Sequence, residues 1–274
     1  MTALQPLYVD SAASGVRLEG PALAVTCPAR ADTRVPLRRL ARVVVRGAVP
    51  FATDALLGCL DAGVPVTFVA LDGRVVGYCI GRETRVQLIG PLLERLVNEP
   101  GWPEIVGRWA QHIESLAMRQ TCHRLQVEPG LDTRPATVWA LLARQIPSAA
   151  TPGAEASLRR LDGLMRAHLV DLLQRAGIPS RFRGRSASAL DLRPYFANAL
   201  GWHLWPVLAR LLEYQGGHPW ISASRRWPDG RRADRDAHRR RRFVVAYEAA
   251  VPAMEAKFRR MLACLEGLLR EHLG

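Results

Sequence analysis

The chain has 274 residues, of which 49% are apolar and 23% are charged. This composition supports a substantial hydrophobic core and excludes a disordered chain, a fibrous repeat and a collagen. Basic residues outnumber acidic residues by 38 to 25, and 37 of the 38 are arginines, which favours a polyanionic partner such as nucleic acid.

The sequence offers no sign of a membrane segment. It lacks an uncharged apolar stretch of about 18 residues, and Met1 to Pro6 lack the basic and apolar regions of a signal peptide. The five cysteines are scattered, without a CxxC pair, as is typical of reduced thiols rather than disulfides or a zinc site. We therefore expect a cytoplasmic protein that does not contact membranes.

The first part of the chain alternates between apolar and polar residues with the period of a β-strand. One helix is expected inside it, capped by Thr53, with Leu56, Leu57 and Leu60 on its apolar face and its end at Gly63. The Asp72-Gly73 pair predicts a hairpin turn. The expected strands cover residues 7–9, 16–20, 22–27, 33–37, 42–46, 64–69 and 75–80.

From Leu88 onward the apolar residues recur with the period of a helix. Helical segments are expected near residues 102–126, 134–146, 155–176, 192–214 and 243–272. The fold class is therefore predicted to be α+β, with a small, mainly β N-terminal domain over residues 1–84 and a larger all-α domain over residues 85–274. Residues 88–274 carry 28 of the 38 basic residues and 18 of the 25 acids.

The strongest basic segment runs from residue 225 to residue 242 and holds nine arginines. Pro228 and Gly230 indicate a loop here, and adjacent like charges favour phosphate contact over a merely solvated surface. A second basic cluster follows Gly177. The expected DNA-binding residues are Arg181, Arg183, Arg185, Arg225, Arg226, Arg231, Arg232, Arg239, Arg240, Arg241 and Arg242.

The last helical segment has an apolar seam with steps of three and four residues, which fits either a core-facing stripe or a dimer contact. The seam consists of Val251, Met254, Phe258, Met261, Leu265 and Leu268.

Short motifs for common chemistries are absent. The sequence contains no HExxH, GxSxG, P-loop or GxGxxG pattern, so a hydrolytic triad and a nucleotide fold have no support. Metal-dependent phosphodiester chemistry would need clustered carboxylates for Mg²⁺ or Mn²⁺. The acids of the helical part are dispersed along the sequence, and their spacing alone does not bring them together.

A succession of motifs in the first 70 residues nevertheless resembles one family. It comprises Leu7-Tyr8-Val9-Asp10, Val16-Arg17-Leu18-Glu19-Gly20, Val35-Pro36-Leu37, Val43-Val44-Val45-Arg46-Gly47 and Gly63-Val64-Pro65-Val66-Thr67-Phe68. The order is similar to that of the N-terminal domain of the CRISPR-associated adaptation integrase/endonuclease family, the first-numbered Cas proteins.

The resemblance implies spacer acquisition. Proteins of this family bind duplex DNA with splayed ends, form dimers that pair again, and are usually bridged by a small partner protein. They join 3′ ends to a repeat with Mg²⁺ or Mn²⁺ held by a Glu, a His and an Asp. DNA, a second copy of the chain and a small CRISPR adaptation partner are therefore the expected partners.

The chain departs from the family where the metal would bind. Asp162, in Arg159-Arg160-Leu161-Asp162-Gly163, stands where the family has glutamate, and His218 is the nearest counterpart of its histidine. Val245 aligns with the metal-binding aspartate, and valine cannot ligate a metal. A degenerate site would leave a non-catalytic DNA-binding or scaffolding subunit.

Two alternatives stay open. An active endonuclease or integrase could use an altered site made of Asp162, His218 and an acid from Asp229, Asp234 or Asp236. A protein-interaction module of the adaptation complex would instead depend on the apolar seam of the last helix. Whether the chain is an enzyme, and whether it needs Mg²⁺, Mn²⁺ or no metal at all, depends on which of these holds.

Overall fold

The structure is a computed structural model that describes residues 4–10, 13, 15–28, 30–81, 89–145, 151–178, 182–183, 189–213 and 230–273. For residues 30, 151–152, 182–183, 213 and 230–240 it describes the backbone alone. The chain divides into two compact units. The first consists mainly of Met1–Asn98 and Gly163–Arg193, and the second of Glu99–Asp162 and Pro194–His272. The predicted domain boundary at residues 84 and 85 lies outside the described residues.

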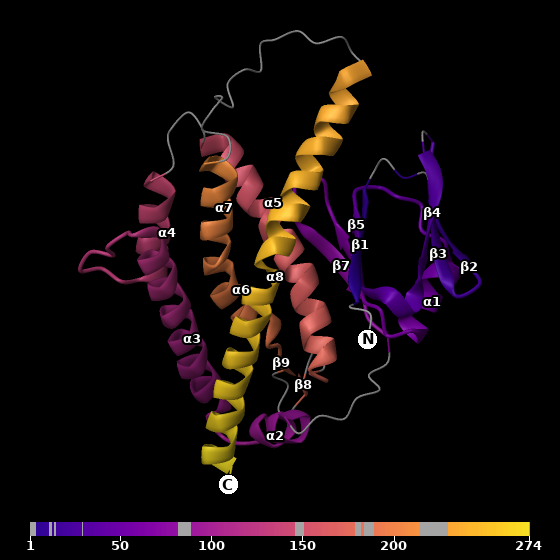
Figure 1. Ribbon diagram of the computed structural model, residues 1–274. Coiled ribbons are helices and arrows are strands. Elements are labelled where there is room, and N and C mark those ends of the chain that lie inside the picture. Colours follow the sequence, from indigo (N-terminus) through magenta and orange to yellow (C-terminus); the bar gives the residue numbers. More distant parts are fainter. Residues whose placement is uncertain are drawn as a thin grey trace. The chain divides into compact units, whose positions relative to one another are not determined.

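The first unit contains a four-stranded sheet of order β1-β5-β6-β7 (Figure 1). β1 (Gln5–Asp10) and β6 (Val66–Val69) flank β5 (Leu40–Arg46) in parallel, and β7 (Val75–Cys79) runs antiparallel to β6. The three adjacent valines of β5, Val43 to Val45, are all buried. This continuous apolar run is typical of a strand that is covered on both faces.

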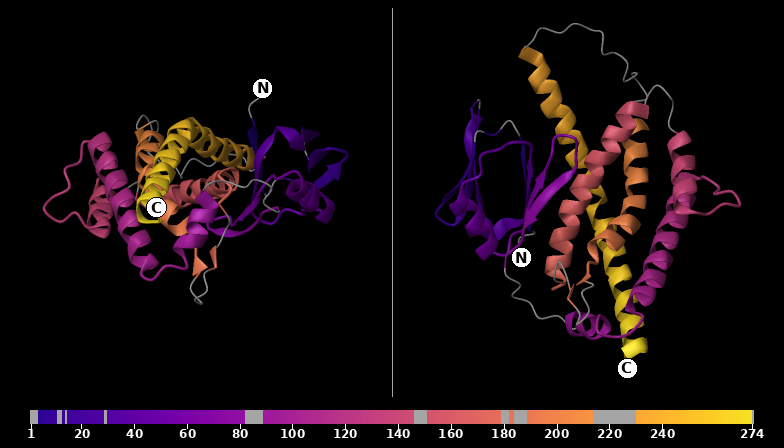
Figure 2. Two further views of the ribbon diagram at one scale, coloured as in Figure 1. Left: turned by 90° about the horizontal axis from the view of Figure 1, so that it is seen from below. Right: turned by 180° about the vertical axis from the view of Figure 1, so that it is seen from behind.

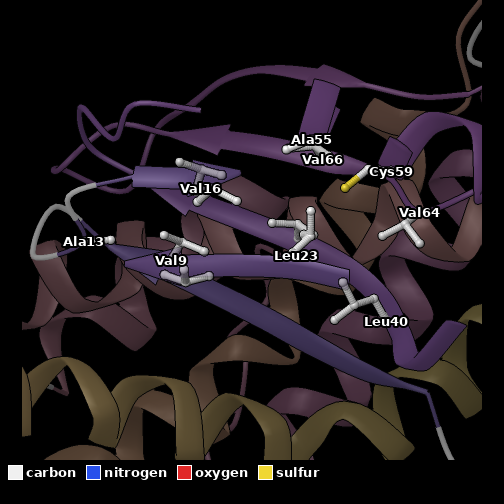
Figure 3. Packing of buried hydrophobic residues seen from close by; sticks show 12 residues of the cluster. Val9, Ala13, Val16, Leu23, Leu40, Ala55, Cys59, Val64 and Val66 are labelled. Carbon is white, nitrogen blue, oxygen red and sulfur yellow. The ribbon is translucent and has the colours of Figure 1, made fainter. Parts of the chain in front are cut away.

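An antiparallel three-stranded sheet pairs β2 (Gly15–Glu19), β3 (Ala22–Cys27) and β4 (Arg30–Pro36). A 3-10 turn, Leu37–Arg39, follows β4. The two sheets and α1 (Thr53–Asp61) enclose one apolar core, to which Val9, Leu23, Leu40, Cys59 and Val66 contribute (Figure 3). These residues come from β1, β3, β5, α1 and β6, so the core joins segments that lie far apart in the sequence.

The other face of the four-stranded sheet is covered by the second half of α5 (Thr151–Arg175). Ala167 packs there against Val44 and Val69, with Leu164 beside them. The first unit also contains α2 (Ile89–Leu96) and the short strands β8 (Phe182–Arg183) and β9 (Ala189–Leu190).

The second unit is helical, as the period of the sequence predicts. Its helices are α3 (Trp102–Leu125), α4 (Pro135–Arg144), the first half of α5, α6 (Arg193–Trp202), α7 (Leu204–Glu213) and α8 (Gly230–Leu273). Aromatic rings fill much of its core. Trp109 meets Phe196 edge to face at 5.3 Å between ring centroids, and Trp139 meets Trp205 at 5.0 Å. No described helix is long and apolar enough to cross a membrane.

Helix α8 is longer than the sequence predicts. It begins at Gly230, so the Arg-rich residues 230–242, which the sequence analysis assigns to a loop, are helical, and residues 225–229 lie outside the described part. The sequence contains a reason for the helix, because Arg231 and Asp234 are three residues apart and Arg232 and Asp236 are four apart, a spacing that stabilises helices. Pro252 lies inside α8 and cannot donate the usual backbone hydrogen bond there.

Two further expectations are corrected. In α1 the buried residues are Ala55 and Cys59, whereas Leu57 is 55% exposed and so does not lie on the core-facing side. Thr53 is the first helical residue of α1 rather than its N-cap. The expected helix over 192–214 is interrupted at His203, which separates α6 from α7. Four of the six seam residues of α8, Met254, Phe258, Met261 and Leu265, are buried within the second unit, which favours the core stripe. The two end residues, Val251 and Leu268, are only half-buried.

Candidate functional site

Asp162 lies at the middle of α5 and is half-buried. The next residue is Gly163, and the close packing of α5 at this position requires a glycine. A methyl group at Gly163 would overlap the backbone carbonyl oxygen of Gly73, in the turn between β6 and β7. Asp162 is thus followed directly by the residue at which α5 meets the β6–β7 turn.

The second carboxylate of α5, Asp171, is 2% exposed and has a structural role. Arg175 donates a hydrogen bond to it at 3.0 Å, and the Arg42 guanidinium of β5 lies 3.7 Å from the same carboxylate. Arg42 also donates to the Tyr8 hydroxyl at 3.1 Å. Burial raises the pKa of Asp171 above its ordinary value, although Arg175, Arg42 and His168 each oppose that shift.

This cluster ties α5 to the four-stranded sheet through charge as well as through apolar packing. Removing one partner from a buried ion pair leaves an uncompensated charge in the interior, which is more costly than the pair itself. Asp171 is therefore occupied by arginines of its own unit and is a structural carboxylate.

Asp191 is similarly engaged. Its two carboxylate oxygens accept hydrogen bonds from Arg193 at 2.9 Å and 2.6 Å, and the Arg193 guanidinium stacks 5.0 Å from the centre of the Tyr78 ring. The bidentate pair raises the pKa of Arg193 further. Asp171 and Asp191 are thus removed from the set of acids that could hold a catalytic metal.

The remaining described acids, histidines and cysteines do not form a metal site. Within the described side chains, no three His, Cys, Asp or Glu residues come close enough to hold an ion, so those residues do not form the Glu-His-Asp site that the sequence resemblance implies. Asp162 is the one candidate ligand whose side chain is described. His218 and Asp229 lie outside the described residues, and Asp234 and Asp236 are placed on α8 by their backbone alone.

Val245 is placed on α8 and is 59% exposed. An exposed valine on a helix makes no contribution to the core and offers no ligand atom. The position that aligns with the family's aspartate is therefore apolar and open to solvent.

The expected DNA-binding arginines are distributed over three places. Arg231, Arg232, Arg239, Arg240, Arg241 and Arg242 belong to α8, where Arg241 is exposed and Arg242 is half-buried. Arg183 belongs to β8, by its backbone. Arg181, Arg185, Arg225 and Arg226 lie outside the described residues.

The helical state of residues 230–242 gives the arginines a periodicity that a loop would lack. Arg232, Arg235, Arg239 and Arg242 are separated by three, four and three residues, so these positions share one side of α8. We name them the α8 arginine row. Arg235 is not among the DNA-binding residues expected from the sequence, because only a helix relates it to the other three.

Comparison with known proteins identifies the family. The family model described as CRISPR associated protein Cas1 matches residues 7–167, more than half of the chain. The chain belongs to the Cas1 family. No curated protein matches the sequence.

Solved structures share the Cas1 fold. A CAS1 protein from Thermotoga maritima superposes with a TM-score of 0.74 at 12% identity, and the match covers 97% of each chain. A casposase bound to integration product gives 0.58 at 10% identity, over 78% of this chain and 74% of that one. A Cas6-RT-Cas1–Cas2 complex gives 0.53 at 13% identity, over 81% of this chain and 29% of that one. At these identities the likeness shows the fold, and the predicted α+β organisation is confirmed.

Proposed function

We propose that this Cas1-family chain takes part in CRISPR adaptation as a DNA-binding subunit whose metal site is degenerate. The observation that carries the proposal is the α8 arginine row, which places four arginine positions on one side of a helix of the second unit. Such a row suits the regularly spaced phosphates of a nucleic-acid backbone, and its binding would be independent of sequence and sensitive to salt.

Two features support the degenerate site. Aspartate replaces glutamate at position 162, which shortens the side chain by one methylene, and a solvent-exposed valine stands at position 245. A ligand set completed from His218, Asp229, Asp234 or Asp236 would make the chain an active Mg²⁺- or Mn²⁺-dependent endonuclease or integrase. We place the non-catalytic function first because the two departures fall on two separate ligand positions.

The proposed partners follow from the family. We propose a homodimer and a small adaptation partner, and a Cas1–Cas2 complex among the structures with this fold supports the second of these. The protein-interaction alternative is weakened by α8, because the apolar seam that a partner would need is largely buried within the second unit.

The DNA-binding part of the proposal is tested by the salt dependence of affinity. The full chain is titrated with duplex DNA carrying short 3′ overhangs between 50 and 200 mM salt, beside a variant with Gln at Arg232, Arg235, Arg239 and Arg242. Each lost phosphate contact should flatten the slope of log K against log salt by about 0.9. The matched control replaces four exposed arginines elsewhere in the second unit, Arg108, Arg119, Arg144 and Arg259. Equal slopes in the two variants would contradict a binding role for the row.

The catalytic part is tested by strand joining. Labelled DNA is mixed with a supercoiled plasmid that carries a repeat, with Mn²⁺ or with EDTA, and Asp162→Ala is run in parallel. We expect DNA retention without product. A metal-dependent product that disappears in Asp162→Ala would establish the active alternative.

A further inference from the structure

A pocket of about 160 Å³ opens in the second unit between α3, α7 and α8. Asp162 is not among the described residues that line it, and none of those residues is acidic. Helices α7 and α8 lie side by side at this place (Figure 2). The pocket therefore differs in both position and charge from the candidate metal site.

Three cations border the pocket, each from a different helix. Arg124 comes from the last turn of α3, Arg210 from α7 and Lys257 from α8. Lys257 is the single lysine of a chain that uses arginine at 37 positions. Its ammonium group donates a hydrogen bond to the side-chain oxygen of Gln120 on α3, which is a neutral acceptor.

The described lining of the pocket contains cations and a histidine but no acid. Burial, together with the charges of Arg260 and Arg124, lowers the pKa of Lys257. His203, also in the lining, has its pKa lowered to about 4 by burial and by Lys257 and Arg124. The Nε2 atom of His203 is buried and has no hydrogen-bond partner among the described residues. A polar atom in this state is stabilised by a ligand that supplies the missing bond.

The rest of the lining is small and apolar. It includes Ala250 and Met254 of α8 and Pro206 and Val207 of α7. The volume is below the 300–1,000 Å³ or so of pockets that enclose a drug-sized ligand. The pocket therefore suits one compact charged group inside, with the uncharged remainder of the ligand lying against the alanine side of α8.

We infer that this pocket binds the phosphate group of a phosphate monoester, such as that of a mononucleotide. A phosphate monoester carries nearly two negative charges at neutral pH and three strong acceptor oxygens. Arginine forks and a lysine point charge recognise such a group from different sides. A carboxylate would offer one charge and two oxygens to the same three cations. This inference goes beyond the proposed function and does not depend on it.

Binding is tested by calorimetry on the full chain with 5′-AMP, adenosine and inorganic phosphate. We expect AMP and phosphate to bind and adenosine not to bind. Lys257→Gln and Arg124→Gln should each weaken AMP binding about tenfold or more, since each removes one charge-assisted hydrogen bond. Arg124 is exposed, so its replacement leaves the core intact. Arg119→Gln, an exposed arginine of α3 outside the pocket, is the matched control and should change the affinity less than twofold.

Competition experiments distinguish a strand end from a free nucleotide as the source of the phosphate. A short single strand with a 5′-phosphate and the same strand without it are tested for displacement of AMP. Displacement by the phosphorylated strand alone would point to a strand end as the source, and displacement by neither strand to a free nucleotide. The inference is overturned if neither AMP, phosphate nor the phosphorylated strand binds, or if Lys257→Gln, Arg124→Gln and Arg119→Gln affect binding equally. Duplex affinity of the arginine-row variant reports on the proposed function separately.

Discussion

Two groups of cations, one in each unit, differ in whether an acid of the fold lies beside them. In the first unit, Arg42 and Arg175 share the carboxylate of Asp171. In the second unit, Arg124, Arg210 and Lys257 border a pocket without an acid among its described lining. We call the first group closed, because one carboxylate of the fold contacts both cations, and the second open, because its described lining offers no acid. Excess positive charge therefore indicates function only where the fold leaves it without an acid.

The largest expected effect is a loss of stability when the closed group is broken. Asp171→Asn would leave Arg42, which is 3% exposed, without its carboxylate, and should lower the free energy of unfolding by about 3–5 kcal/mol. Urea unfolding measures it, with Glu155→Gln as the control, because Glu155 is an exposed acid of the same helix whose surface ion pair with Arg159 should contribute less than about 1 kcal/mol. Similar losses in the two variants would mean that the buried ion pairs of Asp171 do not contribute more to stability than a surface carboxylate does.

The next effect concerns how α5 meets the sheet. Gly163→Ala forces a methyl group onto the carbonyl oxygen of Gly73, so backbone has to move, and we expect a loss of about 1–3 kcal/mol. Gly267 of α8 has open space around its Cβ direction. Gly267→Ala should therefore stabilise the protein by up to about 1 kcal/mol, through helix propensity. A gain in both variants, read from thermal unfolding, would contradict the close approach.

The open group predicts a dependence of stability on pH. The pKa of His203 is lowered to about 4, whereas an unfolded histidine titrates near 6.5, so the unfolded state binds more protons between these values. Stability should thus be lost as pH falls from about 6.5 towards 4. The loss attributable to His203 between pH 7 and pH 5 is about 2 kcal/mol. His203→Gln should lack this part of the pH dependence in urea unfolding, and identical pH profiles would refute the assignment.

The smallest expected effect is a change in the pKa of His203, which lies in the lining of the same pocket. Lys257→Gln removes one of the two charges that disfavour protonation of His203, while burial remains. The pKa of His203, followed by NMR, should rise by less than about one unit. Arg119→Gln should leave it unchanged, and a full return to the value of an exposed histidine would mean that burial is a minor cause.

Much of the fold follows from the sequence, because period and turn signals act locally. The strand at Ala22–Cys27 and the hairpin at Asp72-Gly73 were expected where the structure has them. The interruption at His203 was missed, because apolar residues continue on both sides without a local break signal. The start of α8 was missed for the opposite reason, since Pro228 and Gly230 outweighed the helix-compatible spacing of Arg and Asp that follows.

The candidate site is less accessible to sequence reasoning. Asp162 could be singled out by its motif, but the role of Asp171 depends on Arg42, a residue of a distant strand that packs against the same helix. The anion pocket combines three helices, and each of its cations is an isolated residue in the sequence. Four adjacent arginines attract attention in a sequence, whereas three separate ones do so only once the fold is known.

The contact at Gly163 carries a consequence for variation among relatives. The helix can approach the β6–β7 turn because Gly163 carries no side chain where it meets the carbonyl oxygen of Gly73. A relative with a larger residue at position 163 must therefore lengthen, shorten or displace that hairpin. Residue identity at 163 and hairpin length should covary across the family, because both depend on how closely the helix approaches the sheet in each member.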